Sequence, residues 1–499
     1  MHISRQGGRR PGSVFRPAWM AAAVAALVTG GCDDLLDVTL PDSVTDAALE
    51  NPVGATVQVN SVIASVECAY TAFTVEASGY EDSFQATAPA VGASYADYSH
   101  EAGEGLCDAA ATTYNFFDGF QIARAEGYKA YERISNWTQE ELGNQNKEQL
   151  LALTALYVGI SLDVFGEHFC DIIIDGGPIM NPGQALDLAE QWINTALGHM
   201  DNAGGDFAGV NGSTTSVRTM ALGVRARIRW AKGELAGAAE DAAMVPDGYI
   251  ANATREDGVE RRNKAYNTHT FVRYGIVNGP IDYWTGKPNP VTGVPWPEVI
   301  PFTGYLDLGI LPDGRAVDAD GYPITTAEAG AVEDTRVPTS GPMDAQGGAT
   351  GRAPLKWKGL DDDIPIVNWK EMRLIRAEAD PAQAVAHVNA VREFDDLPLV
   401  TYNPTGEEIE NMIIEERRRA LWLEGRYWAT KILNVDKLWF PRLEGFDQYN
   451  HQLLGGVRLV YPVTEYRLNE NLDENTDMGT GCTGPWADQK PELGRGTSV

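Results

Sequence analysis

The chain has 499 residues, 43% of them hydrophobic, with 12 Trp, 19 Tyr and 14 Phe. This composition is ample for a packed core and excludes a disordered protein. The net charge of −31, from 39 Lys and Arg against 70 Asp and Glu, argues against nucleic acid as a partner, because phosphate contacts need a basic surface. The folded part is also too acidic to dock on anionic lipid, and we expect an extracytoplasmic protein that handles neutral ligands.

The N-terminus has the pattern of a secretory signal. Four arginines and no acid precede a short apolar run, 18–28, and Thr29-Gly30-Gly31 stand directly before Cys32. The apolar run is too short for a stable membrane span. A cysteine after small residues resembles a bacterial lipoprotein processing site, so we expect 1–31 to be a signal peptide, Cys32 to be lipidated, and 32–51 to form a tether. We find no other run of 18 apolar residues and expect a lipid anchor.

Four cysteines remain after Cys32, namely Cys68, Cys107, Cys170 and Cys482. An even number outside the cytoplasm favours disulfides, and no CxxC or Cys/His cluster indicates zinc. Of the three possible pairings, proximity in sequence favours Cys68–Cys107 and Cys170–Cys482.

Apolar residues recur at helical spacing through most of the chain. The helices that we expect span 52–75, 113–137, 147–166, 184–201, 214–232, 234–245, 368–379, 381–395 and 406–428. Small residues such as Gly223 crowd the hairpin formed by 214–245, as close helix packing requires. Residues 79–110 are expected to form a long loop, and 457–461 a short strand. Successive antiparallel helix pairs are typical of tetratricopeptide-like repeats.

Residues 246–365 differ from this pattern. Pro and Gly are dense there, helical periodicity is lost, and aromatic residues occur singly. We expect an irregular insertion with short strands. Within it, Asp361–Asp363 could offer oxygens to calcium or form a solvated turn.

The expected helix 406–428 carries charges on its buried side. Thr405 and Glu408 are spaced as a capping box, and Glu416 and Arg417 interrupt the apolar stripe. Buried charges are tolerated only when they are paired. Glu416 and Arg417 could form a structural ion pair that holds this helix to its neighbour, or a catalytic pair. No nucleophile or metal ligand nearby supports catalysis, so we predict a structural ion pair.

Five blocks in this order resemble the SusD/RagB family of nutrient-binding outer-membrane lipoproteins. The blocks are Cys32–Val38, Thr219–Tyr249, Trp369–Ala379, Glu416–Trp428 and Tyr461–Leu472. Departures from the family pattern, such as Ala420 in place of an acid, are those of a divergent member.

The resemblance implies a mostly α fold in which 52–499 form one SusD-like domain. Helical repeats would occupy about 113–245 and 368–430, and the insertion at about 246–365 would carry the ligand site. It also implies a non-catalytic protein on the outer-membrane surface that binds an oligosaccharide or peptide and delivers it to a TonB-dependent transporter. Calcium is bound by some members of the family, and we expect no other cofactor.

Aromatic side chains in loops are the expected ligand contacts, because sugar C–H faces stack on aromatic rings. The candidates are Tyr80, Tyr95, Tyr98, Tyr283, Trp284 and Trp296. Each of them could instead pack locally within its loop.

Two other functions remain open. A glycan lyase or hydrolase would need paired carboxylates or a Tyr/His/Arg set, and the scattered histidines form no such set. A scaffold that binds only proteins would have an aromatic-poor insertion, and this insertion is aromatic-rich.

Overall fold

The structure is a computed structural model. It describes residues 46–81, 85–86, 116–258, 261–267, 274–275, 304–319, 321–342, 352–438, 445–446, 452–453 and 457–490. The chain divides into two compact units, Met1–Glu50 and Asn51–Val499. In the first unit the described residues form one short helix, α1 (Asp46–Leu49). The remaining elements belong to the second unit.

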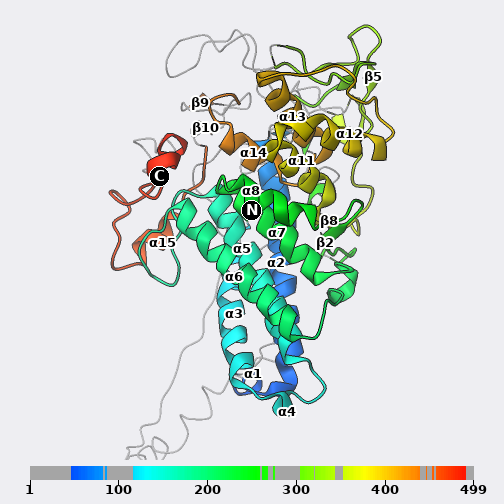
Figure 1. The fold of residues 1–499 in the computed structure, drawn as a ribbon. Helices are drawn as coiled ribbons and strands as arrows, with labels where there is room; N and C mark the ends of the chain where they lie inside the picture. Colours follow the sequence, from blue (N-terminus) through cyan, green and yellow to red (C-terminus); the bar gives the residue numbers. More distant parts are fainter. Residues whose placement is uncertain are drawn as a thin grey trace, which may run out of the picture. The chain divides into compact units, whose positions relative to one another are not determined.

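The second unit is mainly helical (Figure 1). Its longer helices are α2 (Ala55–Tyr80), α3 (Phe117–Asn136), α5 (Lys147–His168), α6 (Pro182–Asn202), α7 (Val217–Ala231), α8 (Leu235–Ala243), α11 (Trp369–Ala379), α12 (Ala384–Phe394), α13 (Glu407–Ala420) and α14 (Tyr427–Leu433). Short helices are α4 (Gln139–Leu142), α9 (Lys264–Asn267) and α15 (Val463–Arg467). Single 3₁₀ turns are η1 (Pro52–Gly54), η2 (Val210–Gly212), η4 (Pro381–Gln383) and η5 (Gly484–Gln489).

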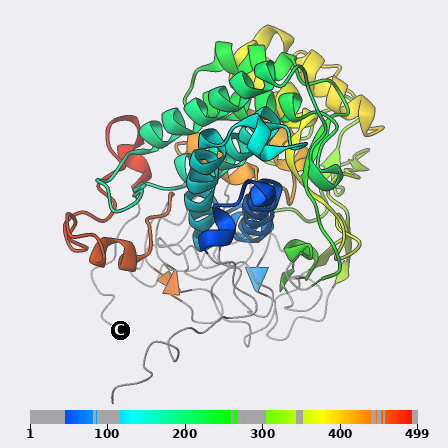
Figure 2. The ribbon, with the colours of Figure 1, turned by 90° about the horizontal axis from the view of Figure 1, so that it is seen from below.

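Neighbouring helices in the sequence pack on one another from α2 to α13. The contacts run through α2–α3, α3–α5, α5–α6, α6–α7, α7–α8, α8–α11, α11–α12 and α11–α13. Figure 2 shows α2 end-on, and α3 and α5 pack against it. The short connections of α7–α8 and α11–α12 make these pairs antiparallel hairpins. The predicted helical-pair body is therefore confirmed.

Helix α5 lies at the centre of this body. By length and composition it would be apolar enough to cross a membrane, but 94% of its most apolar window is buried inside the protein. All residues from Leu150 to His168 are buried, and a helix that is hydrophobic all round belongs in the core. Glycines allow its neighbours to approach closely, since a Cβ at Gly159 would lie 2.5 Å from Ile193 of α6.

The strands are short and form two-stranded antiparallel sheets throughout the described residues. The pairs are β1 (Gln85–Ala86) with β3 (Tyr274–Gly275), β2 (Ile250–Ala253) with β8 (Ile364–Asn368), β4 (Gly309–Ile310) with β5 (Val332–Glu333), β6 (Thr339–Pro342) with β7 (Arg352–Pro354), and β9 (Gly445–Phe446) with β10 (Gln452–Leu453).

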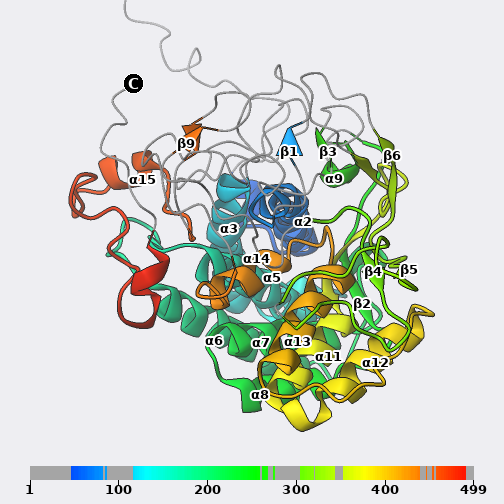
Figure 3. The same ribbon diagram turned by 90° about the horizontal axis from the view of Figure 1, so that it is seen from above.

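The β2–β8 pair closes the base of the insertion. β2 follows α8 and β8 leads directly into α11, so pairing of Ile250 with Asn368 brings the two ends of the insertion together. β8 packs on α7 and α11, and Figure 3 shows β2, β4 and β5 on the same side of the molecule as α12. The insertion therefore begins and ends on the helical body.

Two expected elements differ in the structure. The helix expected at 406–428 ends at Ala420, and α14 starts at Tyr427, because Leu423 and Gly425 adopt positive φ angles of 57° and 70° between them. The expected strand at 457–461 makes only an isolated bridge, Leu459 with Phe169.

Candidate functional site

Tyr80 is the one predicted ligand contact that the structure describes, and it is buried. It is the last residue of α2, is 3% exposed, and stacks on Trp428 with ring centroids 4.1 Å apart. The prediction of a loop position was wrong, because α2 continues past the expected helix end at residue 75. Tyr95, Tyr98, Tyr283, Trp284, Trp296 and the lipidation residue Cys32 lie outside the described residues.

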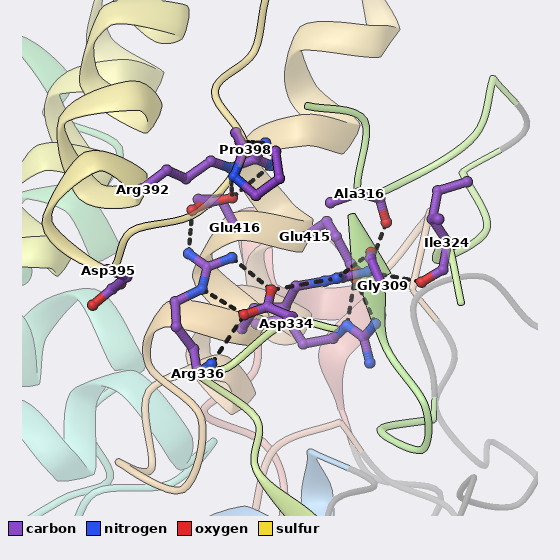
Figure 4. A network of polar contacts seen from close by, with 12 residues as sticks. Gly309, Ala316, Ile324, Asp334, Arg336, Arg392, Asp395, Pro398, Glu415 and Glu416 are labelled. Atoms are coloured by element: carbon purple, nitrogen blue, oxygen red, sulfur yellow. Dashed lines mark hydrogen bonds and ion pairs between the residues drawn. The ribbon is translucent and has the colours of Figure 1, made fainter. Parts of the chain in front are cut away.

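The insertion is held by a buried run of charges on α13, Glu415–Arg419, which we call the α13 cluster. All five side chains are fully buried. Arg419 donates to the carbonyl oxygens of Gly309 (2.8 Å) and Ala316 (2.7 Å), and Arg418 donates to that of Gly304. Insertion loops are thus fixed through their backbone by side chains of the helical body (Figure 4).

Carboxylates within and around the α13 cluster balance these guanidiniums. Glu415 accepts from Arg418 at 2.6 Å and from Arg419 at 2.5 Å. Asp334, from the insertion, pairs with Arg336 at 2.8 Å. Burial alone would raise the pKa of Asp334, but Arg336 and Arg419 outweigh it and hold that pKa well below its ordinary value. The Asp334 carboxylate therefore stays ionised and paired inside the protein.

Glu416 and Arg417, which we predict to form a structural ion pair, are both ion-paired, but each with other partners. Glu416 accepts from Arg392 of α12 at 3.0 Å and from Arg336 of the insertion. Arg417 donates to Glu378 of α11 at 2.5 Å, and its guanidinium lies 4.3 Å from the Trp230 ring centroid. Successive residues of a helix point in different directions, so Glu416 and Arg417 join α13 to different neighbours.

A second buried cluster lies under the turn between α13 and α14. Arg426 donates to Glu167 of α5 at 2.7 and 2.8 Å and to Glu371 of α11 at 2.9 Å. Arg227 of α7 donates to Glu371 at 2.8 Å. Asp163 lies 3.7 Å from Arg227, and burial raises its pKa well above the ordinary value. Three of the motif residues that carry the family resemblance, Arg227, Glu371 and Arg426, thus join α5, α7, α11 and this turn.

A pocket of about 420 Å³ opens between the β2–β8 sheet and the ends of α11, α12 and α13, and we call it the β8 pocket. Three aromatic side chains line it, Trp357 of the insertion, Trp369 of α11 and Phe394 of α12. The Trp369 and Phe394 rings meet edge to face at 5.1 Å. Trp369 is buried, whereas Phe394 is 60% exposed. The pocket is therefore lined by one buried aromatic side chain, Trp369, and by one accessible ring, that of Phe394.

Charged side chains of the β8 pocket are paired with one another or with nearby residues. Lys370 binds Asp395 at 2.7 Å and Lys356 binds Glu424 at 2.7 Å. Arg336 lines the pocket and is also ion-paired with Glu416. Figure 4 labels Arg336 and Asp395, two of the charged residues that line the pocket. Asp363 accepts the N–H of Arg255 at 2.7 Å.

Sequence reasoning missed the β8 pocket as a site. Its lining comes from β2, the insertion, β8, α11, α12 and the turn after α13, and no local motif joins these segments. Trp357 was visible only as one of several isolated aromatic residues of the insertion.

The acidic stretch Asp361–Asp363 forms a hydrogen-bonded turn. Asp362 accepts the backbone N–H groups of Lys358 and of Gly359, the latter at 3.1 Å. Within the described ranges, no group of three or more His, Cys, Asp or Glu side chains is arranged to hold a metal ion.

The predicted Cys170–Cys482 disulfide is present. Cys68 is also disulfide-bonded, and its predicted partner, Cys107, lies outside the described residues. The Cys170–Cys482 bond ties the segment after 457 to the end of α5.

Solved structures have a fold similar to that of this chain. A similar solved structure is a SusD-like protein from Bacteroides fragilis NCTC 9343, 13% identical, with a TM-score of 0.54 over 86% of this chain and 98% of that chain. Another is a SusD superfamily protein from Bacteroides thetaiotaomicron VPI-5482, 13% identical, with a TM-score of 0.55 over 85% and 99%. No family model matches this chain, and none of the curated proteins does. The protein has the SusD-like fold, at a low sequence identity that marks it as divergent.

Proposed function

We propose that the protein is a non-catalytic glycan-binding lipoprotein of the outer-membrane surface that delivers its ligand to a TonB-dependent transporter. The SusD-like fold and the resemblance of the five sequence blocks support this function. The arginine-rich N-terminus and Cys32 support the lipid anchor.

The observation that carries the proposal is the attachment of the insertion to the α13 cluster. Gly304, Gly309 and Ala316 each accept a hydrogen bond from a buried arginine of α13. Loops that start from a fixed base lose less conformational entropy when they bind a ligand. The predicted aromatic contacts Tyr283, Trp284 and Trp296 precede these fixed residues in the same insertion.

The buried state of the core carboxylates supports a binding role over an enzymatic one. Glu167, Glu371 and Glu416 are at most 2% exposed and each is ion-paired with arginine. A general acid or base must reach its substrate directly or through one water. These three carboxylates serve the packing of the helices.

A panel of soluble plant, algal and bacterial glycans tests the proposal. We expect at least one glycan to bind in isothermal titration calorimetry and to be recovered unchanged after long incubation with the protein. Turnover of any glycan would contradict the non-catalytic role, and failure of the whole panel to bind would contradict glycan recognition.

The anchor and the transporter have separate tests. Metabolic labelling with a palmitate analogue is expected to mark the wild-type protein and to leave Cys32→Ala unmarked. Detergent extraction followed by pull-down is expected to recover a TonB-dependent transporter with the wild-type protein. Equal labelling of Cys32→Ala would overturn the anchor, and recovery of the protein alone would overturn the partner.

A further inference from the structure

The geometry points to the β8 pocket as an additional sugar-binding site, which takes a single uncharged sugar unit. This inference deepens the proposed function and rests on it for the class of ligand. The site is separate in the sequence from the predicted loop contacts at 80–98 and 283–296. Its volume of about 420 Å³ lies in the range of pockets that take small molecules.

An accessible aromatic ring is the first feature that fits a sugar. Phe394 is 60% exposed, and it is the one aromatic ring among the exposed large apolar side chains of the described residues. Its ring is held in place by the edge-to-face contact with Trp369 and by Lys370, whose Nζ lies 5.3 Å from the ring centroid. A ring fixed in this way offers a flat apolar surface to the C–H face of a sugar.

Charge balance is the second feature, and it selects against charged ligands. The lining has three cations, Arg336, Lys356 and Lys370, and three carboxylates, Asp363, Asp395 and Glu424. A charged ligand would have to compete with the Lys370–Asp395 and Lys356–Glu424 pairs. A sugar hydroxyl both donates and accepts, so it can bind to a lysine and a carboxylate at once without separating them.

Uncommitted polar groups are the third feature. The indole N–H of Trp357 is shielded from solvent and has no hydrogen-bond partner. A buried donor without an acceptor is costly, and this N–H can gain a ligand hydroxyl as acceptor only when the indole moves enough to expose it to the pocket. Asn252 of β2 and Thr335 also line the pocket and add an amide and a hydroxyl for recognition.

The pocket contains no arrangement for cleaving a glycosidic bond. Glu424 accepts from Lys356 and from Asn368 at 3.0 Å, and Asp395 accepts from Lys370. Each of these two carboxylates is therefore already bound to a lysine of the lining. The site is expected to bind and release its sugar unchanged.

Saturation-transfer NMR and calorimetry on the purified mature protein test the inference. The probes are glucose, galactose and N-acetylglucosamine, and their charged counterparts are glucuronic acid, galacturonic acid and glucosamine, in that order. At least one neutral sugar is expected to bind, and its charged counterpart at least tenfold more weakly. Equal binding of the two, or binding of none of the neutral sugars, would overturn the inference.

Two substitutions place the binding in the β8 pocket. Phe394→Ala removes the exposed ring, and Thr335→Trp fills the pocket from an exposed position without removing a core side chain. Each is expected to weaken binding of the neutral sugar at least tenfold. The control Met244→Ala removes another exposed apolar side chain, 65% exposed, outside the lining, and is expected to leave binding unchanged.

The outcomes separate this inference from the proposed function. A long glycan could bind the wild-type protein and both pocket variants equally well, and the short neutral sugars could also bind all three proteins equally. That outcome overturns the pocket inference and leaves the proposed function in place. Where neither short sugars nor glycans bind the wild-type protein, both are overturned. A loss confined to the two pocket variants, with normal thermal unfolding of Thr335→Trp, supports the pocket.

Discussion

At the scale of single residues, Glu416 has the clearest energetic role. It is fully buried and accepts hydrogen bonds from two arginines, Arg336 of the insertion and Arg392 of α12. Burial would raise its pKa, but the two arginines hold that pKa below the ordinary value of 4.5. The negative charge of Glu416 thus offsets the positive charges of two buried guanidiniums, which would otherwise be only partly paired.

Glu416→Gln is expected to lower the free energy of unfolding by about 3–5 kcal/mol, because it leaves buried positive charge unpaired. Urea denaturation measures the loss. The matched control on the same helix is Glu410→Gln, because Glu410 is 62% exposed and pairs with Lys437 at the surface. This control is expected to cost less than about 1 kcal/mol. Similar losses in the two variants would contradict the role of the buried pair.

Glu81 is a second buried carboxyl group, at the point where α2 ends. Its Oε1 accepts the N–H of Tyr427 at 2.8 Å and that of Trp428 at 3.2 Å, at the start of α14. Burial raises the pKa of Glu81 to about 8 despite these two donors. The folded protein therefore keeps this proton over a range where the unfolded chain has released it.

This difference predicts a pH dependence of stability. Since the folded state binds more protons between about pH 4.5 and 8, the contribution of Glu81 to the free energy of unfolding falls as pH rises through that window. Glu81→Gln has no such proton, so its stability relative to the wild type is expected to rise by up to about 1.4 kcal/mol per pH unit and to level off above pH 8. Denaturation at a series of pH values measures this, and parallel profiles would contradict it.

At the scale of elements, the turn between α13 and α14 ends the helix directly after the α13 cluster. Gly425 has φ of +70°, and a Cβ there would lie 3.1 Å from Phe73 and 3.3 Å from the Cα of Thr74 in α2. Glycine is needed for the positive φ and also for the close approach of α2. The turn allows Arg426 to reach Glu167 and Glu371.

Gly425→Ala is expected to lower the free energy of unfolding by about 1–3 kcal/mol through backbone strain, with a further loss from the contacts with α2. Gly176→Ala is the matched control, because Gly176 has the same φ of +70° and no heavy atom within 4 Å of the added Cβ. The difference between the two losses in the free energy of unfolding measures the cost of the contacts with α2. Equal losses would show that the close approach of α2 does not contribute to this free energy.

The sequence predicts most of the longer helices because apolar residues recur along them at helical spacing, and some of these helices also have recognisable caps. Asn181 with Gln184 forms a capping box at α6, and Asn146 caps α5. The break after Ala420 is not foreseeable, because it depends on Leu423 adopting a left-handed conformation that leucine rarely takes. Burial of Glu416 and Arg417 follows from periodicity, but their partners come from α11, α12 and the insertion, and only the tertiary structure assigns them.

The candidate sites also differ in how far the sequence predicts them. Aromatic residues in expected loops can be selected from composition alone. Tyr80 shows the weakness of this selection, because α2 continues past its expected end and the Tyr80 ring is buried against Trp428. The β8 pocket requires Asn252, Trp357, Lys370 and Phe394 to meet. These residues are far apart in the sequence and form no motif, so no local pattern predicts the pocket.

At the scale of the whole molecule, the segment 457–490 returns to the helical body. Leu459 exchanges backbone hydrogen bonds with His168 and Cys170 at the end of α5. The carboxylate of Asp171 accepts from Tyr466 and from the N–H of Gly481 at 2.7 Å. The Cys170–Cys482 disulfide, with a sequence separation of 312 residues, makes this attachment covalent.

Replacing both cysteines, as Cys170→Ser with Cys482→Ser, is expected to lower the free energy of unfolding by about 2–5 kcal/mol. It is also expected to speed limited proteolysis within 470–490, because that segment then depends on hydrogen bonds alone. Mass spectrometry of the early fragments measures the cleavage sites. An unchanged cleavage pattern would show that the hydrogen bonds around Asp171 are sufficient.

The α13 cluster also constrains the order in which the chain folds. Arg419 lies 110 residues after Gly309 and 103 after Ala316, and Arg418 lies 114 after Gly304. Contacts between segments so far apart form slowly and late, and a chain that leaves the ribosome from its N-terminus presents the whole insertion before α13 exists. The hydrogen bonds that fix Gly304, Gly309 and Ala316 therefore form only after residue 420 has been made, when more than four-fifths of the chain exists.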